Sequence, residues 1–274
     1  MRTKSTLLMA AGTLLAAGLA LAQLLPEEPG QEAKWIDFLK TASITAAEQL
    51  GGAEAVTNPY KLTLEKDGVK HLALWKNVDN REMGRPDLWR YEIAACRMDR
   101  LLGLRMVPLT VERRYNENRG SLQLWEENQF SLKTKNDKNI AVPPRSTYGW
   151  NNAIFLQRAF DNLIANEDRH ANNILITQDW RMILIDHSRT FRTSKKFTDT
   201  LIYTEKHPEG PKLMKQLPRA FVEKLKGLTA ESIRTAVGEY LEDDEIKAVL
   251  VRRDLILAEI DRLIKKNGRD NTLY

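Results

Sequence analysis

The sequence predicts an α+β protein with two lobes, in which a strand-rich first half with one main helix precedes a helical second half. Two patterns support this fold class. Short stretches of the first half alternate apolar and polar residues, as strands do, and much of the second half repeats its apolar residues every three or four positions, as helices do. The chain has 274 residues, 42% of them hydrophobic, which is enough to bury a core without disulfides or a structural metal.

The N-terminus predicts a signal peptide over residues 1–22. Arg2 and Lys4 precede an apolar run, Leu7–Leu25, which contains the small-x-small pattern Ala20-Leu21-Ala22 of a cleavage site. The run is also nearly long enough to span a bilayer, so an uncleaved membrane anchor is the alternative. Basic residues before the run and acidic residues after it predict, in both cases, a protein body outside the cytosol. The expected location is therefore a periplasm, a secretory-pathway lumen or the extracellular medium.

A first lobe is expected at residues 57–127, after a linker and a helix at residues 23–56. The helix is expected to run from Trp35 to about Leu50, before two glycines. The lobe is expected to consist of a hairpin with a turn at Lys66-Asp67-Gly68, one main helix between a proline and a glycine, and two more strands. These elements are expected at Tyr60–Leu64, His71–Lys76, Pro86–Gly103, Val107–Glu112 and Ser121–Trp125.

A second lobe is expected at residues 128–274. It opens with a polar stretch, residues 128–147, which is expected to be a loop or an insertion because Lys, Asn and Asp cluster there beside two prolines. A helix is expected to begin near Trp150, and a hairpin is expected at residues 174–185. The last long helix is expected over Asp244–Lys266.

Charge and cysteine content exclude some partners and sites. The net charge is +5, from 42 Lys and Arg against 37 Asp and Glu, and the basic residues form no cluster of the kind that binds nucleic acid. No nucleic-acid partner is therefore expected. Cys96 is the single cysteine, so no intramolecular disulfide can form, and the four histidines are too dispersed for a zinc site.

Three polar residues at the second-lobe hairpin predict a site for phosphoryl transfer: Asp168, Asn173 and Asp186. The hairpin returns the chain to its start, so Asn173 and Asp186 are expected side by side. A carboxylate and an amide oxygen suit the hard Mg²⁺ ion that phosphoryl transfer requires. A second carboxylate nearby can accept the proton of the attacking hydroxyl. Asp168 lies five positions before Asn173, which is the offset of that base in kinases.

This segment resembles the catalytic segment of the atypical kinases. Phe160–His170, followed by Asn173 and Asp186, looks like the phosphatidylinositol 3/4-kinases, the HipA-type bacterial kinases and the secretory-pathway kinases that phosphorylate secreted proteins or proteoglycan xylose, and is most similar to the last group. Upstream, stretches of Tyr91–Pro108 are similar to the first-lobe helix of those proteins. The resemblance covers residues 57–191. It implies a bilobal protein-kinase-like fold with the catalytic hairpin in the second lobe.

The resemblance implies a nucleotide site in the first lobe. Lys76 takes the place of the lysine that holds the α- and β-phosphates of ATP, so it is expected to act in catalysis as well as in binding. Glu92 is expected to pair with it. The segment Leu122–Glu126 takes the place of the hinge that receives adenine. Its expected contacts with the nucleotide are Leu124, Trp125 and Glu126.

In the second lobe the resemblance implies that Asp168 is the catalytic base and that Asn173 and Asp186 bind Mg²⁺ or Mn²⁺. Asn172 is the alternative to Asn173 as the metal ligand. The sequence departs from the kinase pattern in two places. The first-lobe strands contain no glycine-rich phosphate loop, and His-Ser rather than Phe-Gly follows Asp186.

The expected function is ATP-dependent transfer of a phosphoryl group to a hydroxyl on a protein, a glycan or a small molecule, outside the cytosol. One alternative is a pseudokinase that binds nucleotide or a regulatory partner, and the other is a kinase-fold enzyme that transfers AMP or phosphorylates a lipid. A membrane contact is expected only for the uncleaved N-terminal segment. ATP is present in a eukaryotic secretory lumen but is not expected in a bacterial periplasm, so the phosphoryl donor depends on the compartment.

Overall fold

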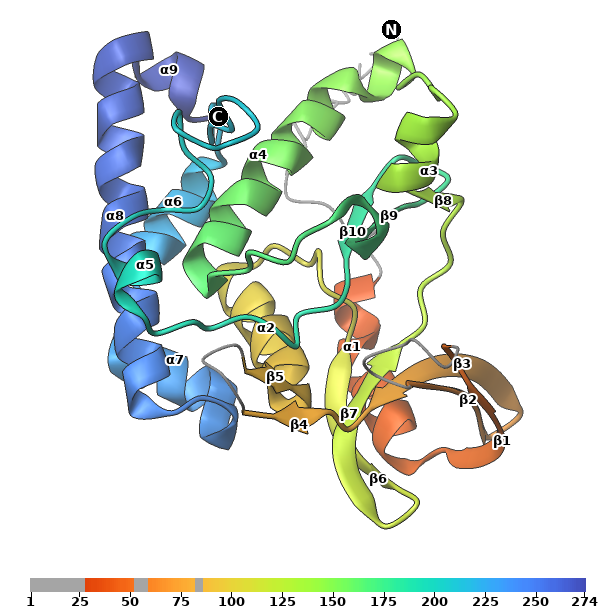
Figure 1. The fold of residues 1–274 in the computed structure, drawn as a ribbon. Coiled ribbons are helices and arrows are strands. Elements are labelled where there is room, and N and C mark those ends of the chain that lie inside the picture. The colour runs from red at the N-terminus through yellow and green to blue at the C-terminus, as the bar shows by residue number, and fades with distance from the viewer. Residues whose placement is uncertain (1–27, 52–58, 82–85) are drawn as a thin grey trace, which may run out of the picture.

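The computed structural model describes residues 28–51, 59–81 and 86–274. The signal peptide expected at residues 1–22 lies outside the described residues. The fold is α+β, with an antiparallel sheet in the first half and most of the helices in the second (Figure 1). The sheet lies toward one end of the molecule and helices α6–α9 lie toward the other, which is compatible with a two-lobe arrangement.

The five-stranded sheet has the order β1-β2-β3-β7-β6, and all of its neighbouring strands are antiparallel. The expected hairpin joins β2 to β3 through Asp67 and Gly68, with φ angles of 51° and 76°. Positive φ at both central residues is what a type I′ hairpin turn requires. The strands are β1 (Ser43–Gln49), β2 (Tyr60–Lys66), β3 (Val69–Lys76), β6 (Thr110–Tyr115) and β7 (Asn118–Leu124).

The prediction of a helix from Trp35 to Leu50 is wrong for the second half of that segment. The helix α1 spans Glu28–Thr41, and β1 begins at Ser43 and pairs with β2 along its length. Two alanines and a glutamate in β1 favour a helix, but the pairing with β2 satisfies the backbone polar groups of this segment in the sheet. The sheet therefore starts within the segment that we expected to precede the first lobe.

The main helix of the first half is α2 (Trp89–Leu102), which ends at Gly103 as expected. Gly103 has a φ of 72° and forms the left-handed C-cap that glycine favours. The helix begins three residues later than predicted, because Asp87–Leu88 forms the short strand β5, which pairs with β4 (Asp79–Asn80).

The second half contains the remaining helices and a small sheet of order β10-β9-β8. The stretch at residues 128–147, expected as a loop, contains β8, α3 and a 3₁₀ turn, and the strands of the expected hairpin are three residues long. The strands are β8 (Phe130–Ser131), β9 (Ile174–Ile176) and β10 (Met182–Leu184). The α-helices are α3 (Leu132–Asp137), α4 (Thr147–Ile164), α5 (Lys195–Thr198), α6 (Arg219–Lys226), α7 (Ala230–Val237), α8 (Asp243–Asn267) and α9 (Arg269–Thr272). The 3₁₀ helices are η2 (Pro144–Ser146), η3 (Ala171–Asn173) and η4 (Gly238–Tyr240).

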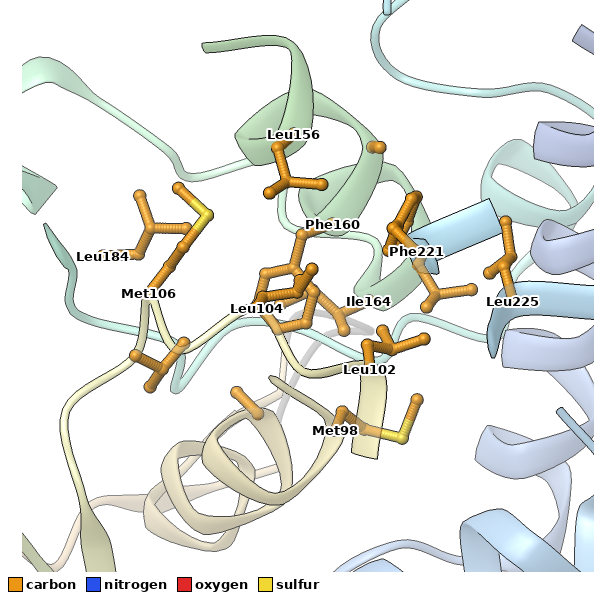
Figure 2. Packing of buried hydrophobic residues seen from close by; sticks show 14 of the residues in the cluster. Met98, Leu102, Leu104, Met106, Leu156, Phe160, Ile164, Leu184, Phe221 and Leu225 are labelled. Carbon is orange, nitrogen blue, oxygen red and sulfur yellow. The ribbon is translucent and has the colours of Figure 1, made fainter. Parts of the chain in front are cut away.

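The described residues form two hydrophobic clusters. The smaller one lies between the sheet and α1 and contains Leu62 and Trp75. The larger one fills the helical half and includes the buried face of α2. Figure 2 shows Leu102 of α2 in this cluster with Phe160 of α4 and Phe221 of α6. The helix α2 therefore packs on the helical half although it belongs to the strand-rich half in sequence, and this fixes its position relative to the β9–β10 hairpin.

No helix in residues 28–51, 59–81 and 86–274 is long and apolar enough to cross a membrane.

Candidate phosphoryl-transfer site

Lys76, Glu92 and Asp186 meet in one cluster, although they come from β3, α2 and the segment after β10. The ammonium Nζ of Lys76 lies 2.7 Å from Oε1 of Glu92 and 2.8 Å from Oδ1 of Asp186. The Lys76 side chain is 11% exposed, that of Glu92 is 2% exposed and that of Asp186 is 40% exposed. The lysine is thus held from its buried side by Glu92, and the Asp186 carboxylate faces the solvent.

The three charges stabilise one another. Burial alone would lower the pKa of Lys76, but the charges of Glu92 and Asp186 outweigh it and hold the pKa above its ordinary value. Burial alone would raise the pKa of Glu92, but the charge of Lys76 is the main effect that outweighs it, and the pKa lies well below its ordinary value. Both members of the buried pair are therefore ionised at neutral pH.

The backbone around Asp186 is fixed on both sides. The N–H of Ile185 donates to the carbonyl oxygen of Asn173 at 3.1 Å, and the N–H of His187 donates to Oε2 of Glu92 at 3.0 Å. Between them, Asp186 has a φ of 63°, in the left-handed region that few residues other than glycine adopt. The two hydrogen bonds hold the backbone of Asp186 in this conformation.

Asn173 lies beside Asp186, as the hairpin predicts. Its Nδ2 donates to Oδ2 of Asp186 at 3.4 Å. A half-turn of the amide exchanges its nitrogen and oxygen, so the same side chain can present Oδ1 to a cation. Asn173 is buried against the site and Asn172 is exposed, which favours Asn173 as the ligand. One carboxylate and one amide oxygen fit a Mg²⁺ or Mn²⁺ ion that takes its other ligands from phosphates and water.

Asp168 makes no direct hydrogen bond or ion pair with Lys76, Glu92, Asn173 or Asp186, and its carboxylate pairs instead with Arg189, a residue that the sequence did not single out. Oδ2 of Asp168 accepts a hydrogen bond from Nη1 of Arg189 at 3.2 Å, and the N–H of Asp168 donates to Oδ1 of Asn166 at 3.2 Å. The Asp168 carboxylate is partly exposed. It is therefore open to an incoming acceptor.

A buried arginine, Arg169, holds the two ends of the β9–β10 hairpin together. The guanidinium of Arg169 pairs with Asp161 at 3.0 Å, with both side chains almost completely buried. It also donates to the carbonyl oxygens of Asn173 at 2.9 Å and Ile185 at 2.5 Å. One side chain thus joins both ends of the hairpin, which explains how two short strands bring Asn173 and Asp186 together.

His187 is a neutral member of the same network. Burial lowers the pKa of His187, and the neighbouring charge of Arg169 lowers it further. Arginine only donates, so Nη2 of Arg169 donates to Nε2 of His187 at 2.8 Å and the ring proton is assigned to Nδ1. Nδ1 lies 3.6 Å from Oε2 of Glu92, which is longer than a hydrogen bond. His187 therefore fills the space between Arg169 and Glu92 and does not face the solvent.

The expected hinge lies on the strand next to Lys76. Ala73 pairs with Leu124 and Lys76 pairs with Ser121, so Leu124 is three strand positions, about 10 Å, from Lys76 along the sheet. The N–H of Leu124 donates to the carbonyl oxygen of Leu109, just before β6, and the N–H of Trp125 donates to the carbonyl oxygen of Leu72 in β3. Leu124 is buried, while Trp125 and Glu126 are partly exposed. This distance would allow a nucleotide to place its adenine near Leu124 and its phosphates near Lys76. The backbone N–H groups of Leu124 and Trp125 are not free to bind the adenine, because they already donate to other carbonyl oxygens.

A cavity of about 670 Å³ lies next to the segment that contains Asp168. It is lined by Glu167, which precedes Asp168, by α5, by the segment after α5, and by α8. This volume is in the range of small-molecule sites. The ion pair between Lys196 of α5 and Glu167, at 2.6 Å, lies at its wall.

Sequence reasoning thus identified Lys76, Glu92, Asn173 and Asp186, which the structure brings into direct contact. It missed Arg189 and its second partner Asp87, because no spacing rule connects them. Among the described residues, no group of three or more His, Cys, Asp or Glu side chains could hold a metal. A cation bound by Asn173 and Asp186 would not form such a group, because one ligand is an amide.

Comparisons with known proteins add no family to this description. No model of a known protein family matches the sequence, and no curated protein is significantly similar to it.

Proposed function

We propose that this protein is a phosphotransferase of the atypical kinase type, which uses ATP with Mg²⁺ or Mn²⁺ and transfers a phosphoryl group to a hydroxyl. The observation that carries the proposal is the contact of Lys76 with both Glu92 and Asp186. A structural ion pair needs one carboxylate. Here a second, half-exposed carboxylate shares the lysine and has the amide of Asn173 beside it.

Each residue has a task in this reaction. Lys76, held by Glu92, donates to the phosphates of the nucleotide. Asn173 and Asp186 hold the cation, which when bound neutralises part of the phosphate charge. Asp168 orients the acceptor hydroxyl and takes its proton as the oxygen–phosphorus bond forms and the bond to the leaving ADP breaks.

A bilobal, kinase-like arrangement of the fold is part of the same proposal. A bilobal kinase-like fold needs the lysine on a strand, its carboxylate partner on a neighbouring helix, and the base and metal ligands on a hairpin in the other lobe. Supporting observations are that Lys76 ends β3, that Glu92 lies in the first turn of α2, and that Asn173 and Asp186 flank the β9–β10 hairpin. Location outside the cytosol remains a proposal from the N-terminal sequence alone.

The first test is a thermal-shift measurement with ATP in the presence and absence of Mg²⁺ or Mn²⁺. We expect metal-dependent stabilisation of the wild type by ATP, and its loss in Asp186→Ala. Asp199→Ala is the matched control, because Asp199 is an exposed carboxylate at the end of α5. The absence of metal-dependent stabilisation in the wild type contradicts the proposal.

The second test separates the alternatives among nucleotide-binding proteins. ATP labelled in the γ-phosphate should pass its label to an acceptor, and ATP labelled in the α-phosphate should not. Transfer from the α-position alone would identify an AMP-transferring enzyme. Binding without transfer to proteins, glycans, small alcohols or lipids would favour a pseudokinase.

A further inference from the structure

Arg189 connects the base of the proposed reaction to a buried carboxylate in the other half of the chain. Its Nη1 donates to Oδ2 of Asp168 at 3.2 Å, and its Nε donates to Oδ2 of Asp87 at 2.8 Å. The Asp87 side chain is 6% exposed, whereas the guanidinium and the Asp168 carboxylate are partly exposed. The arginine thus has a buried end on Asp87 and an open end on Asp168.

Asp87 fixes the arginine to the start of α2. Asp87 lies in β5, directly before α2, and the N–H of Leu88 donates to the carbonyl oxygen of Ser188 at 2.8 Å. The chain just after Asp186 is therefore attached to the helix that carries Glu92. The pKa of Arg189 is raised above its ordinary value, chiefly by the hydrogen bond to Asp87. Oδ1 of Asp87 is buried and has no partner among the described residues, and Arg189 is the cation that pairs with this carboxylate in that part of the chain.

We propose that Arg189 is a positioning residue for Asp168, which rests on the function proposed above. By holding Oδ2, it fixes the rotamer of Asp168 and leaves Oδ1 for the acceptor hydroxyl. Among the residues that the structure describes, Oδ1 of Asp168 has no hydrogen-bond partner. A misplacement of about 1 Å in such a group can lower a rate by about 10²-fold. Because Asp87 adjoins α2, the same arginine keeps the base in a constant relation to Glu92 and, through it, to Lys76.

The competing explanation is purely structural: Arg189 would serve only to neutralise buried Asp87. The two roles predict different results when Asp87 and Arg189 are both replaced. If the arginine is structural, Asp87→Asn restores whatever Arg189→Ala destroys, because no buried charge is left. If it positions the base, Asp87→Asn restores stability and does not restore turnover.

The experiment uses the full chain with the variants Arg189→Ala, Arg189→Lys, Asp87→Asn and the double variant Asp87→Asn with Arg189→Ala. Three quantities are measured: the melting temperature, the dissociation constant of ATP with Mg²⁺, and the kcat of ATP hydrolysis, with water as the acceptor. In Arg189→Ala we expect a lower melting temperature and a kcat about 10- to 100-fold lower, with nucleotide affinity within about twofold. The double variant should regain the melting temperature and keep the low kcat. Arg189→Lys, which retains a cation near Asp168, should recover part of the kcat.

Four results would overturn the inference. They are a wild-type kcat in Arg189→Ala, a kcat that recovers together with stability in the double variant, a loss of nucleotide affinity as large as the loss of kcat, and nucleotide binding without hydrolysis in the wild type. A wild type that binds no nucleotide with metal contradicts the proposed function itself. The two failures are therefore distinguishable.

Discussion

The ammonium of Lys76 lies 2.8 Å from the carboxylate of Asp186, although 110 positions separate them in the sequence. The same ammonium lies 2.7 Å from Glu92. This contact joins the strand that carries the lysine, the helix that carries its partner and the hairpin that carries the proposed metal ligands. Three consequences of this arrangement, and one of an ion pair elsewhere in the fold, can be measured.

The first prediction concerns the buried pair of Lys76 and Glu92. Lys76→Met should lower the free energy of unfolding by about 3–5 kcal/mol, because it leaves the Glu92 carboxylate buried without its cation. Lys76→Met combined with Glu92→Gln should recover most of that loss, and neither variant should bind ATP. Urea unfolding measures the first effect and thermal shift with nucleotide the second. If Lys76→Met unfolds with the same free energy as the wild type, the ion pair between Lys76 and Glu92 contributes nothing to stability.

The second prediction concerns the base. Asp168→Asn keeps the shape of the side chain and removes its ability to take a proton, so it should spare nucleotide binding and lower turnover by about 10²–10⁴-fold. The check is a parallel measurement of ATP affinity and of the transfer or hydrolysis rate. Wild-type turnover in this variant would remove Asp168 from the role of base.

The third prediction decides between two neighbouring asparagines. Asn173→Ala should raise the Mg²⁺ or Mn²⁺ concentration needed for ATP-dependent stabilisation, because Asn173 is buried beside Asp186. Asn172→Ala is the matched control and should behave as the wild type, because Asn172 is exposed. The measurement is a metal titration at constant ATP. A larger effect of Asn172→Ala would reverse the assignment.

The fourth prediction is a pH dependence away from the site. Glu112 of β6 accepts hydrogen bonds from Arg119 at 2.6 Å and from the hydroxyl of Tyr240 in η4 at 3.0 Å. The hydrogen bond from Arg119 is the main reason that the pKa of Glu112 lies below its ordinary value of 4.5. Because the pKa of Glu112 is lower in the folded state, the unfolded state binds the proton at a higher pH than the folded state does as the pH falls. The stability contributed by ionised Glu112 is therefore present above pH 4.5 and is lost as the pH falls through the lowered pKa.

Glu112→Gln tests this sign. Its melting temperature should lie below that of the wild type at neutral pH, and the difference should shrink as the pH falls through 4.5 and below. A difference that grows toward acid pH would contradict the assignment. Because this ion pair lies outside the proposed site, nucleotide affinity at neutral pH should not change.

Local patterns were sufficient for part of the fold. The β2–β3 hairpin follows from the Asp67–Gly68 turn, and the end of α2 follows from Gly103, because both depend on the conformations that neighbouring residues allow. The strand β1 could not be predicted from local patterns. Its residues favour a helix, and only its pairing with β2 makes it a strand.

The sequence by itself determined the positions of Asp168, Asn173 and Asp186 along the chain and the hairpin that brings the last two together, because spacing and periodicity are local properties. Only the tertiary structure decided that Lys76 reaches Asp186 and that Arg189 joins Asp168 to Asp87. These contacts depend on α2, whose buried face packs in the core of the helical half rather than in that of the sheet. Packing between distant segments of a chain leaves no periodic signal in the sequence, and for that reason the ion pairs that complete the site had to be seen in three dimensions.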